Sequence, residues 1–142
     1  MTFKSTLGSY LIVFSSFCNW NINSLAKDNF KRIELIESHN AIYNYDIISL
    51  CEVSLNSSVD IPNPLLENYT FHSKNNPSGN KHGGVGLFYK NCLPVIVRED
   101  LSYEESLVIE LKFGRKKIFF TVIYRITYLL ITIVTVVLLF YC

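Results

Sequence analysis

The chain has 142 residues, of which 49% are hydrophobic and 18% are charged. This composition argues against intrinsic disorder and suffices for one domain with an apolar core. Its 13 basic and 12 acidic residues give a formal net charge of +1, so no overall field indicates a nucleic-acid or membrane-surface partner. The 4 cysteines are scattered without the spacing of zinc ligands, which favours reduced core residues in an intracellular compartment.

The first third of the chain predicts a strand, a helix and a second strand. The apolar run Tyr10–Cys18 is typical of a strand, and Asp46–Cys51 has the pattern of a strand buried on both faces. Between them, apolar residues recur at three-residue spacing after Asp28, a candidate helix N-cap, and end near Asn40. Such a unit places its two strands parallel in one sheet.

The middle of the chain predicts strands separated by turns. An exposed loop is expected over 74–81, where Asn, Pro, Ser and Gly dominate. The glycines of 83–86 indicate that the backbone passes close to another element there. The natural architecture is α/β, a sandwich of mixed sheets with helices outside. Strands are expected at 69–73, 82–90, 93–97, 107–113 and 117–124.

The segment Ile126–Cys142 contains no charged residue, glycine or proline. We expect an apolar C-terminal helix or tail here, and its length makes it a candidate transmembrane segment. Basic residues at 115–117 and 125 precede it, which would keep the preceding part of the chain cytoplasmic. Two interpretations stay open: a genuine membrane anchor, or apolar sequence translated after a nuclease reading frame was lost.

Polar side chains follow the two strands of the predicted parallel pair. Asn21 comes just after the first strand, and Glu52 comes directly after the second. Ligands gather beyond the carboxyl ends of parallel strands, so both side chains are expected in one crevice. A carboxylate beside an amide is a sensible set of ligands for magnesium, which takes few carboxylates and keeps several waters. The structural alternative is a turn asparagine and a solvated glutamate.

The order of four segments resembles the endonuclease/exonuclease/phosphatase superfamily, and within it the apurinic-type endonuclease domain of non-LTR (LINE-type) retrotransposons. The resemblance implies a four-layer α/β sandwich that hydrolyses phosphodiesters of DNA with Mg²⁺. By motif, it implies that Glu52 binds the metal and that Asn21 and Tyr124 are catalytic residues beside the phosphate. A purely structural Tyr124 is the alternative. The segments are Asn21–Leu25, Ile48–Glu52, Gly83–Phe88 and Val122–Arg125.

The resemblance ends after residue 125. Related domains continue with a proline-containing loop, a Gly-Asp-Phe-Asn segment and a Ser-Asp-His segment, and this sequence contains none of them. We therefore expect a partial domain over 1–125, the N-terminal half of the sandwich, and a hydrophobic tail over 126–142. The expected function is that of a truncated retrotransposon endonuclease, inactive as this chain. The alternatives are another phosphodiesterase or phosphatase of the superfamily, or a non-catalytic, tail-anchored membrane fragment.

Overall fold

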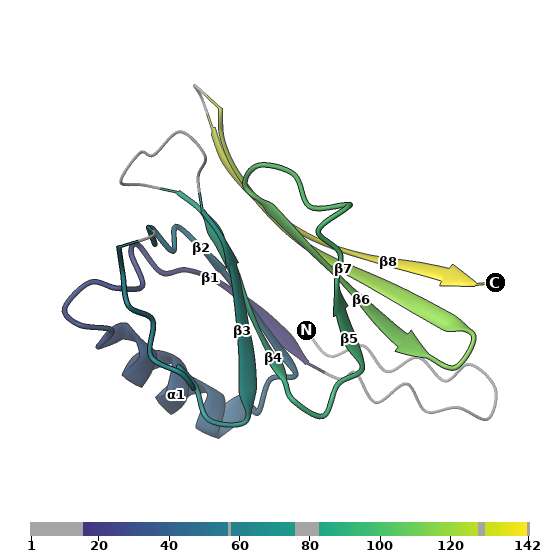
Figure 1. The fold of residues 1–142 in the computed structure, drawn as a ribbon, viewed down its shortest axis with the longest axis horizontal. Coiled ribbons are helices and arrows are strands. Elements are labelled where there is room, and N and C mark those ends of the chain that lie inside the picture. Colours follow the sequence, from purple (N-terminus) through teal and green to yellow (C-terminus); the bar gives the residue numbers. More distant parts are fainter. Residues whose placement is uncertain (1–15, 57, 76–82, 128–129, 142) are drawn as a thin grey trace.

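The computed structural model describes residues 16–56, 58–75, 83–127 and 130–141. These residues form eight strands and one helix (Figure 1). In chain order the elements are β1 (Phe17–Asn21), α1 (Arg32–Tyr43), β2 (Ile47–Cys51), β3 (Tyr69–Lys74), β4 (Val85–Lys90), β5 (Val95–Val97), β6 (Ser106–Phe113), β7 (Lys116–Thr127) and β8 (Leu130–Tyr141).

The strands form two sheets of four. The N-terminal sheet has the order β1-β2-β4-β3, in which only β1 and β2 run parallel. A parallel pair needs a crossover connection, and α1 supplies it. The C-terminal sheet has the order β5-β6-β7-β8 and is antiparallel throughout. The N-terminal sheet is therefore mixed and the C-terminal sheet is antiparallel, a combination that an α/β architecture allows.

The N-terminal sheet is covered on both faces, which explains why every residue of β2 is buried. Ile48 and Leu50 belong to the apolar core beneath α1, which also contains Ile33 and Ile36 of the helix. The alternate residues of β2 face the C-terminal sheet. Figure 1 shows the resulting layers of helix, sheet and sheet. The fourth layer that the sandwich prediction requires is not seen among the described residues.

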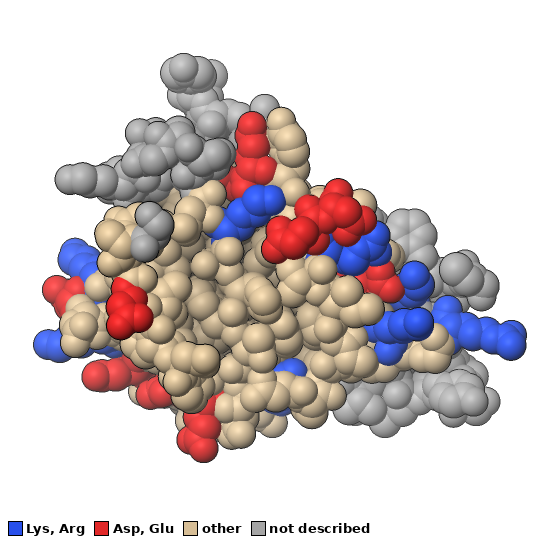
Figure 2. Space-filling model, viewed as in Figure 1, with Lys and Arg blue, Asp and Glu red and all other residues tan. Residues whose placement is uncertain are grey.

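Packing between the two sheets forms the second core. Side chains of β2 and β4 meet those of β6 and β7, and the largest fully buried members include Leu87, Ile109, Leu111 and Phe120. Phe17 of β1 lies edge-on against Phe120, with ring centroids 5.5 Å apart. Charged side chains lie mainly around the rim of the face drawn in Figure 2, with both signs interspersed. The surface thus agrees with the nearly balanced composition.

The predicted strands from 46 onward are confirmed, with small shifts at their ends. The predicted N-cap, Asp28, is wrong: α1 begins at Arg32 after Lys31, which makes no side-chain cap. Asp28 has φ 54° and lies in a run of left-handed residues that reaches Phe30, so the chain cannot yet be helical there. The first strand covers Phe17–Asn21, while residues 10–15 of its predicted range, and 76–81 of the predicted loop, lie outside the described residues.

The C-terminal segment is a strand, and the predicted apolar helix is wrong. β8 pairs antiparallel with β7 along its length, from Lys116↔Tyr141 to Thr127↔Leu130. The segment is rich in threonine, valine and isoleucine, whose branched side chains favour a pleated strand over a helix. Within the described ranges, no helix is both long and apolar enough to cross a membrane.

The close backbone approach that the glycines predicted is present in β4. A Cβ atom built on Gly86 would lie 2.8 Å from Cε2 of Phe71 on the neighbouring strand β3. Gly84 has φ +80°, and a Cβ there would lie 3.1 Å from the carbonyl oxygen of Lys74. Both glycines are therefore required by packing or by backbone conformation.

Gly86→Ala is expected to lower the free energy of unfolding by about 1–3 kcal/mol, because the new methyl group overlaps the Phe71 ring. Urea denaturation measures the change. The control is Gly86→Ala in a Phe71→Leu background, where the closest contact is removed and the added loss should be clearly smaller, although Cγ1 of Val53 still lies 3.1 Å from the new methyl group. An equal loss in both backgrounds would contradict this account.

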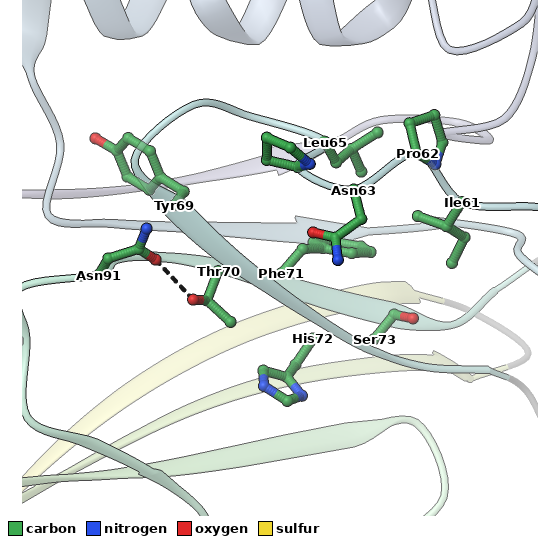
Figure 3. A pocket seen from close by; sticks show the side chains of 11 residues that line it. Ile61, Pro62, Asn63, Leu65, Tyr69, Thr70, Phe71, His72, Ser73 and Asn91 are labelled. Atoms are coloured by element: carbon green, nitrogen blue, oxygen red, sulfur yellow. Dashed lines mark hydrogen bonds between the residues drawn. The ribbon is translucent and has the colours of Figure 1, made fainter.

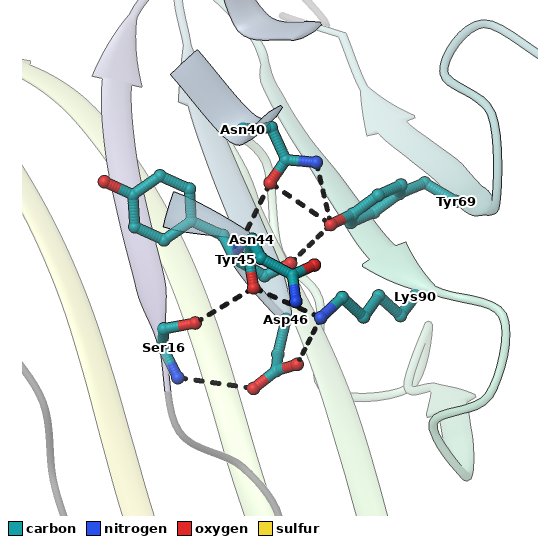
Figure 4. A network of polar contacts seen from close by, with 7 residues as sticks. All are labelled: Ser16, Asn40, Asn44, Tyr45, Asp46, Tyr69 and Lys90. Atoms are coloured by element: carbon teal, nitrogen blue, oxygen red, sulfur yellow. Dashed lines mark hydrogen bonds and ion pairs between the residues drawn. The ribbon is translucent and has the colours of Figure 1, made fainter. Parts of the chain in front are cut away.

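A buried polar network joins the start of β2 to β4 and α1 (Figure 4). The Asp46 carboxylate pairs with the Lys90 ammonium at 2.9 Å and accepts a hydrogen bond from the Ser16 amide at 3.3 Å. The Tyr69 hydroxyl donates to the Tyr45 carbonyl. Only 11% of the Asp46 side chain is exposed, so its charge depends on these partners rather than on water.

Asp46→Ala is expected to lower the free energy of unfolding by about 3–5 kcal/mol, because it leaves the half-buried ammonium of Lys90 unpaired. Asp100→Ala is the matched control, since Asp100 pairs with Arg98 while its side chain is 61% exposed. Exposed ion pairs contribute little to stability. Similar destabilisation in both variants, measured by urea denaturation, would show that the burial of Asp46 is unimportant.

Candidate functional site

Asn21, Glu52 and Tyr124 meet at one end of the sandwich, and we call these three residues the Glu52 site. The Asn21 amide donates a hydrogen bond from Nδ2 to Oε1 of Glu52 at 2.8 Å. The Tyr124 hydroxyl donates to the same oxygen at 2.9 Å. The three residues come from β1, the residue after β2, and β7. The structure therefore brings together all three residues that the sequence singled out.

The backbone after β1 and β2 fixes the positions of Asn21 and Glu52. Asn21 is the register partner of Cys51, and the parallel pairing continues past both strands through two further bonds. Ser24 donates to the Glu52 carbonyl at 2.7 Å, and Leu25 donates to the Val53 carbonyl at 2.9 Å. Glu52 itself has φ 56°, a left-handed conformation that turns the chain sharply at the sheet edge.

The side-chain amide of Asn21 is held at both ends. Its Oδ1 accepts the backbone N–H of Asn23 at 3.1 Å, the local pattern by which asparagine stabilises turns. Because Oδ1 faces its own backbone, Nδ2 is left to face Glu52. The Asn-x-Asn spacing that the sequence displayed thus orients the donor amide.

Tyr124 reaches the site from the opposite sheet. Tyr124 is 3% exposed and belongs to the core between the sheets. Burial raises the pKa of Tyr124 well above its ordinary value, and the hydrogen bond to Glu52 and the nearby charge of Glu105 raise it further. A hydroxyl with so high a pKa stays protonated at neutral pH and acts as a hydrogen-bond donor.

Glu105 is a second carboxylate near the site that the sequence did not single out. Its backbone carbonyl accepts the Tyr124 N–H at 3.0 Å, and its Oε1 accepts the Gly84 N–H at 3.0 Å. In the sequence it stands in an acidic stretch typical of a solvated turn. No local pattern relates Glu105 to the Gly84 N–H, which comes from a different part of the chain.

Cys51 lies beside the site without taking part in nucleophilic chemistry. The residue is completely buried, and burial, together with the charges of Glu52 and Glu105, raises the pKa of its thiol to about 12. A thiol with this pKa is neutral and unreactive at neutral pH. The interpretation of this cysteine as a reduced core residue agrees with its surroundings.

The donor set of the Glu52 site suits a hard divalent cation. Both site hydrogen bonds fall on Oε1 of Glu52, so within the described ranges Oε2 accepts none. Magnesium is bound by one or two carboxylates and retains several waters. The described part of the chain has no cluster of three or more His, Cys, Asp or Glu side chains that could enclose a metal. The residues present therefore fit a largely hydrated ion held through Glu52.

A separate pocket lies along β3, the edge strand of the N-terminal sheet farthest from β1 (Figure 3). The loop around Pro62 and Pro64 forms one wall, and Tyr69–Ser73 forms another. The Thr70 hydroxyl donates to the Asn91 side chain at 2.7 Å at its edge. None of the Glu52 site residues lines this pocket, so it belongs to a different surface.

Glu52→Gln is expected to lower the pKa of Tyr124, because the variant removes the negative charge that disfavours tyrosinate. Ultraviolet titration measures this pKa, with a Tyr124→Phe variant subtracted to isolate one of the 9 tyrosines. The stability supplied by the raised pKa is fully present below pH about 10 and is lost as pH rises through the folded-state pKa. An unchanged titration in Glu52→Gln would contradict the coupling.

Comparisons with known proteins agree with the geometry. A sequence profile of the endonuclease/exonuclease/phosphatase family matches residues 18–134, a range that contains Asn21, Glu52 and Tyr124. A search of curated proteins finds no match. Members of the matched family are generally metal-dependent. The chain therefore belongs to the endonuclease/exonuclease/phosphatase family.

Proposed function

We propose that the Glu52 site is the metal- and phosphate-binding part of a phosphodiester-hydrolysing site, of the magnesium-dependent DNA endonuclease type found in LINE-type retrotransposons. One observation carries the proposal: two hydrogen-bond donors from β1 and β7 converge on one oxygen of Glu52. These two bonds hold the Glu52 carboxylate in one orientation at the end of the parallel pair.

Each residue has a role that its surroundings support. Glu52 would hold a magnesium ion, which supplies positive charge that offsets the charge developing on a phosphate during hydrolysis. Asn21 contributes an oriented amide donor at the exposed edge of the site. Tyr124 contributes a hydroxyl that stays protonated, and its single hydrogen, now donated to Glu52, would have to turn to a phosphate oxygen when a ligand binds. Tyr124 is buried and Asn21 is exposed, so a ligand would reach Glu52 from the side of Asn21.

DNA is the proposed substrate class, because the segments around Asn21, Glu52 and Tyr124 resemble those of retrotransposon endonucleases. The net charge of +1 gives no overall attraction for nucleic acid, so we expect affinity to come mainly from the site itself. Phosphatases and other phosphodiesterases of the superfamily use the same kind of glutamate. A substrate series that includes DNA, an inositol phosphate and a choline phosphodiester distinguishes them.

We also propose that this 142-residue chain binds its ligands without turning them over. Related domains take their water-activating base and their acid from the Gly-Asp-Phe-Asn and Ser-Asp-His segments, which this sequence lacks. General-base and general-acid assistance each contribute roughly 10²- to 10⁴-fold to rate. Without both, hydrolysis should fall below detection even where the cation and phosphate bind.

The first measurement is Mg²⁺ binding by calorimetry to the chain and to Glu52→Gln. Changes in groups that merely support a metal ligand cost roughly 10- to 100-fold in affinity, so loss of the ligand itself should cost at least about tenfold. Glu37→Gln is the control, because Glu37 is an exposed carboxylate on α1. Equal Mg²⁺ affinity in Glu52→Gln and in the unaltered chain would refute the metal role of Glu52.

The second measurement is nicking of supercoiled plasmid with Mg²⁺, for which we expect no product. The unaltered chain and Glu52→Gln, purified in parallel, should be indistinguishable. Nicking by the unaltered chain that Glu52→Gln abolishes would overturn the proposed inactivity while supporting the endonuclease chemistry. Nicking that persists in both would point to a contaminating nuclease and is excluded by repeating the purification.

A further inference from the structure

A groove beside the Glu52 site has properties that the hydrolysis of a phosphate does not require. It lies between the end of β1 and the first turns of α1 and has a volume of about 400 Å³, within the range of ligand pockets. We call it the Trp20 groove. Its lining residues are Trp20, Asn21, Ile22, Arg32, Leu35 and His39.

One wall of the Trp20 groove is aromatic and apolar. The indole of Trp20 is partly buried against the core beneath α1, and the His39 ring lies edge-on to it with centroids 4.8 Å apart. Leu35 is 65% exposed although it is a large apolar residue. An exposed leucine beside a partly exposed indole gives a flat apolar ligand a surface on which to stack.

The groove also carries one positive charge. The Arg32 guanidinium donates from Nη1 to the Ile22 carbonyl, so it is fixed over the end of β1 with further N–H donors available. The guanidinium and the aromatic wall together favour a ligand that is aromatic and negatively charged.

Asn21 connects this groove to the Glu52 site. It lines the groove and also donates to Oε1 of Glu52, so a molecule with its phosphate at Glu52 can extend directly along Trp20. A nucleotide unit has the required sequence of groups, with a phosphate followed by a flat base. A lipid tail would leave the guanidinium of Arg32 without a counter-charge.

We propose that the Trp20 groove binds the base of a nucleotide adjacent to the phosphate held at the Glu52 site, with the base stacked on Trp20 and Arg32 facing a neighbouring phosphate. The proposal rests on the proposed phosphodiester chemistry and adds a specific position for one base. Stacking on an aromatic side chain accepts any base, because every base has a π-face. The groove would therefore add affinity for nucleic acid without strong sequence preference.

Trp20 is the only tryptophan of the chain, so its fluorescence reports on the groove without reference to activity. Deoxyadenosine 5′-monophosphate should quench Trp20 emission saturably, whereas deoxyribose 5-phosphate, which lacks the base, should not at the same concentration. Glu37→Gln should leave the quenching unchanged, because Glu37 is an exposed carboxylate of α1 that does not line the groove. Equal quenching by both phosphates would overturn the proposal.

A matched pair of variants on α1 locates the binding surface. Leu35→Gln should weaken nucleotide binding several-fold, because it replaces the exposed apolar wall. Ile42→Gln is the control, since Ile42 is 74% exposed on the same helix and does not line the groove. Calorimetry with Trp20→Leu should show a loss of about tenfold or more. Unchanged affinity in both Leu35→Gln and Trp20→Leu would place the base elsewhere.

The two proposals fail in different ways. If the cation binds through Glu52 but no base-dependent quenching occurs, the Trp20 groove is not a base site and the proposed function stands. If base-dependent quenching occurs while Mg²⁺ affinity is insensitive to Glu52→Gln, the groove proposal stands and the metal role of Glu52 is wrong.

Discussion

The apolar contact between the two sheets is the interaction on which the rest of the structure depends. Leu87 of the N-terminal sheet and Ile109 and Phe120 of the C-terminal sheet are completely excluded from solvent, which makes this contact the main source of burial for β6 and β7. The Glu52 site spans the same contact, since Glu52 follows β2 and Tyr124 belongs to β7. Loss of packing between the two sheets would therefore also separate the residues of the Glu52 site.

The proximity of Asn21 and Glu52 was predictable from the chain alone. Two apolar runs joined by one amphipathic segment imply parallel strands, and parallel strands bring the residues after their carboxyl ends together. Tyr124 was not predictable in this way, because nothing local relates a residue of β7 to the end of β2. Only the family resemblance of the segments around all three residues suggested that Tyr124 belongs to the site. The spacing of residues along the chain does not predict that Tyr124 lies close to Glu52.

Other features were hidden because the sequence signal has more than one physical solution. The uncharged segment after residue 125 has the length and apolar character of a membrane helix, but its branched residues also suit a strand, and β8 within it pairs with β7. The start of α1 was misplaced because an aspartate before an apolar repeat is the ordinary N-cap signal, whereas here three left-handed residues delay the helix. Glu105 was missed because its partner is a backbone N–H of Gly84, which composition cannot reveal.

The left-handed backbone conformation of Glu52 is unfavourable for the stability of the fold. Glutamate adopts positive φ reluctantly, and such conformations cost on the order of 1–3 kcal/mol unless surrounding contacts impose them. Glycine at this position would relieve the strain and remove the carboxylate at the same time. The proposed ligand chemistry of Glu52 therefore carries a cost in stability that a glycine would avoid, a cost shared by the other non-glycine residues with positive φ among those described.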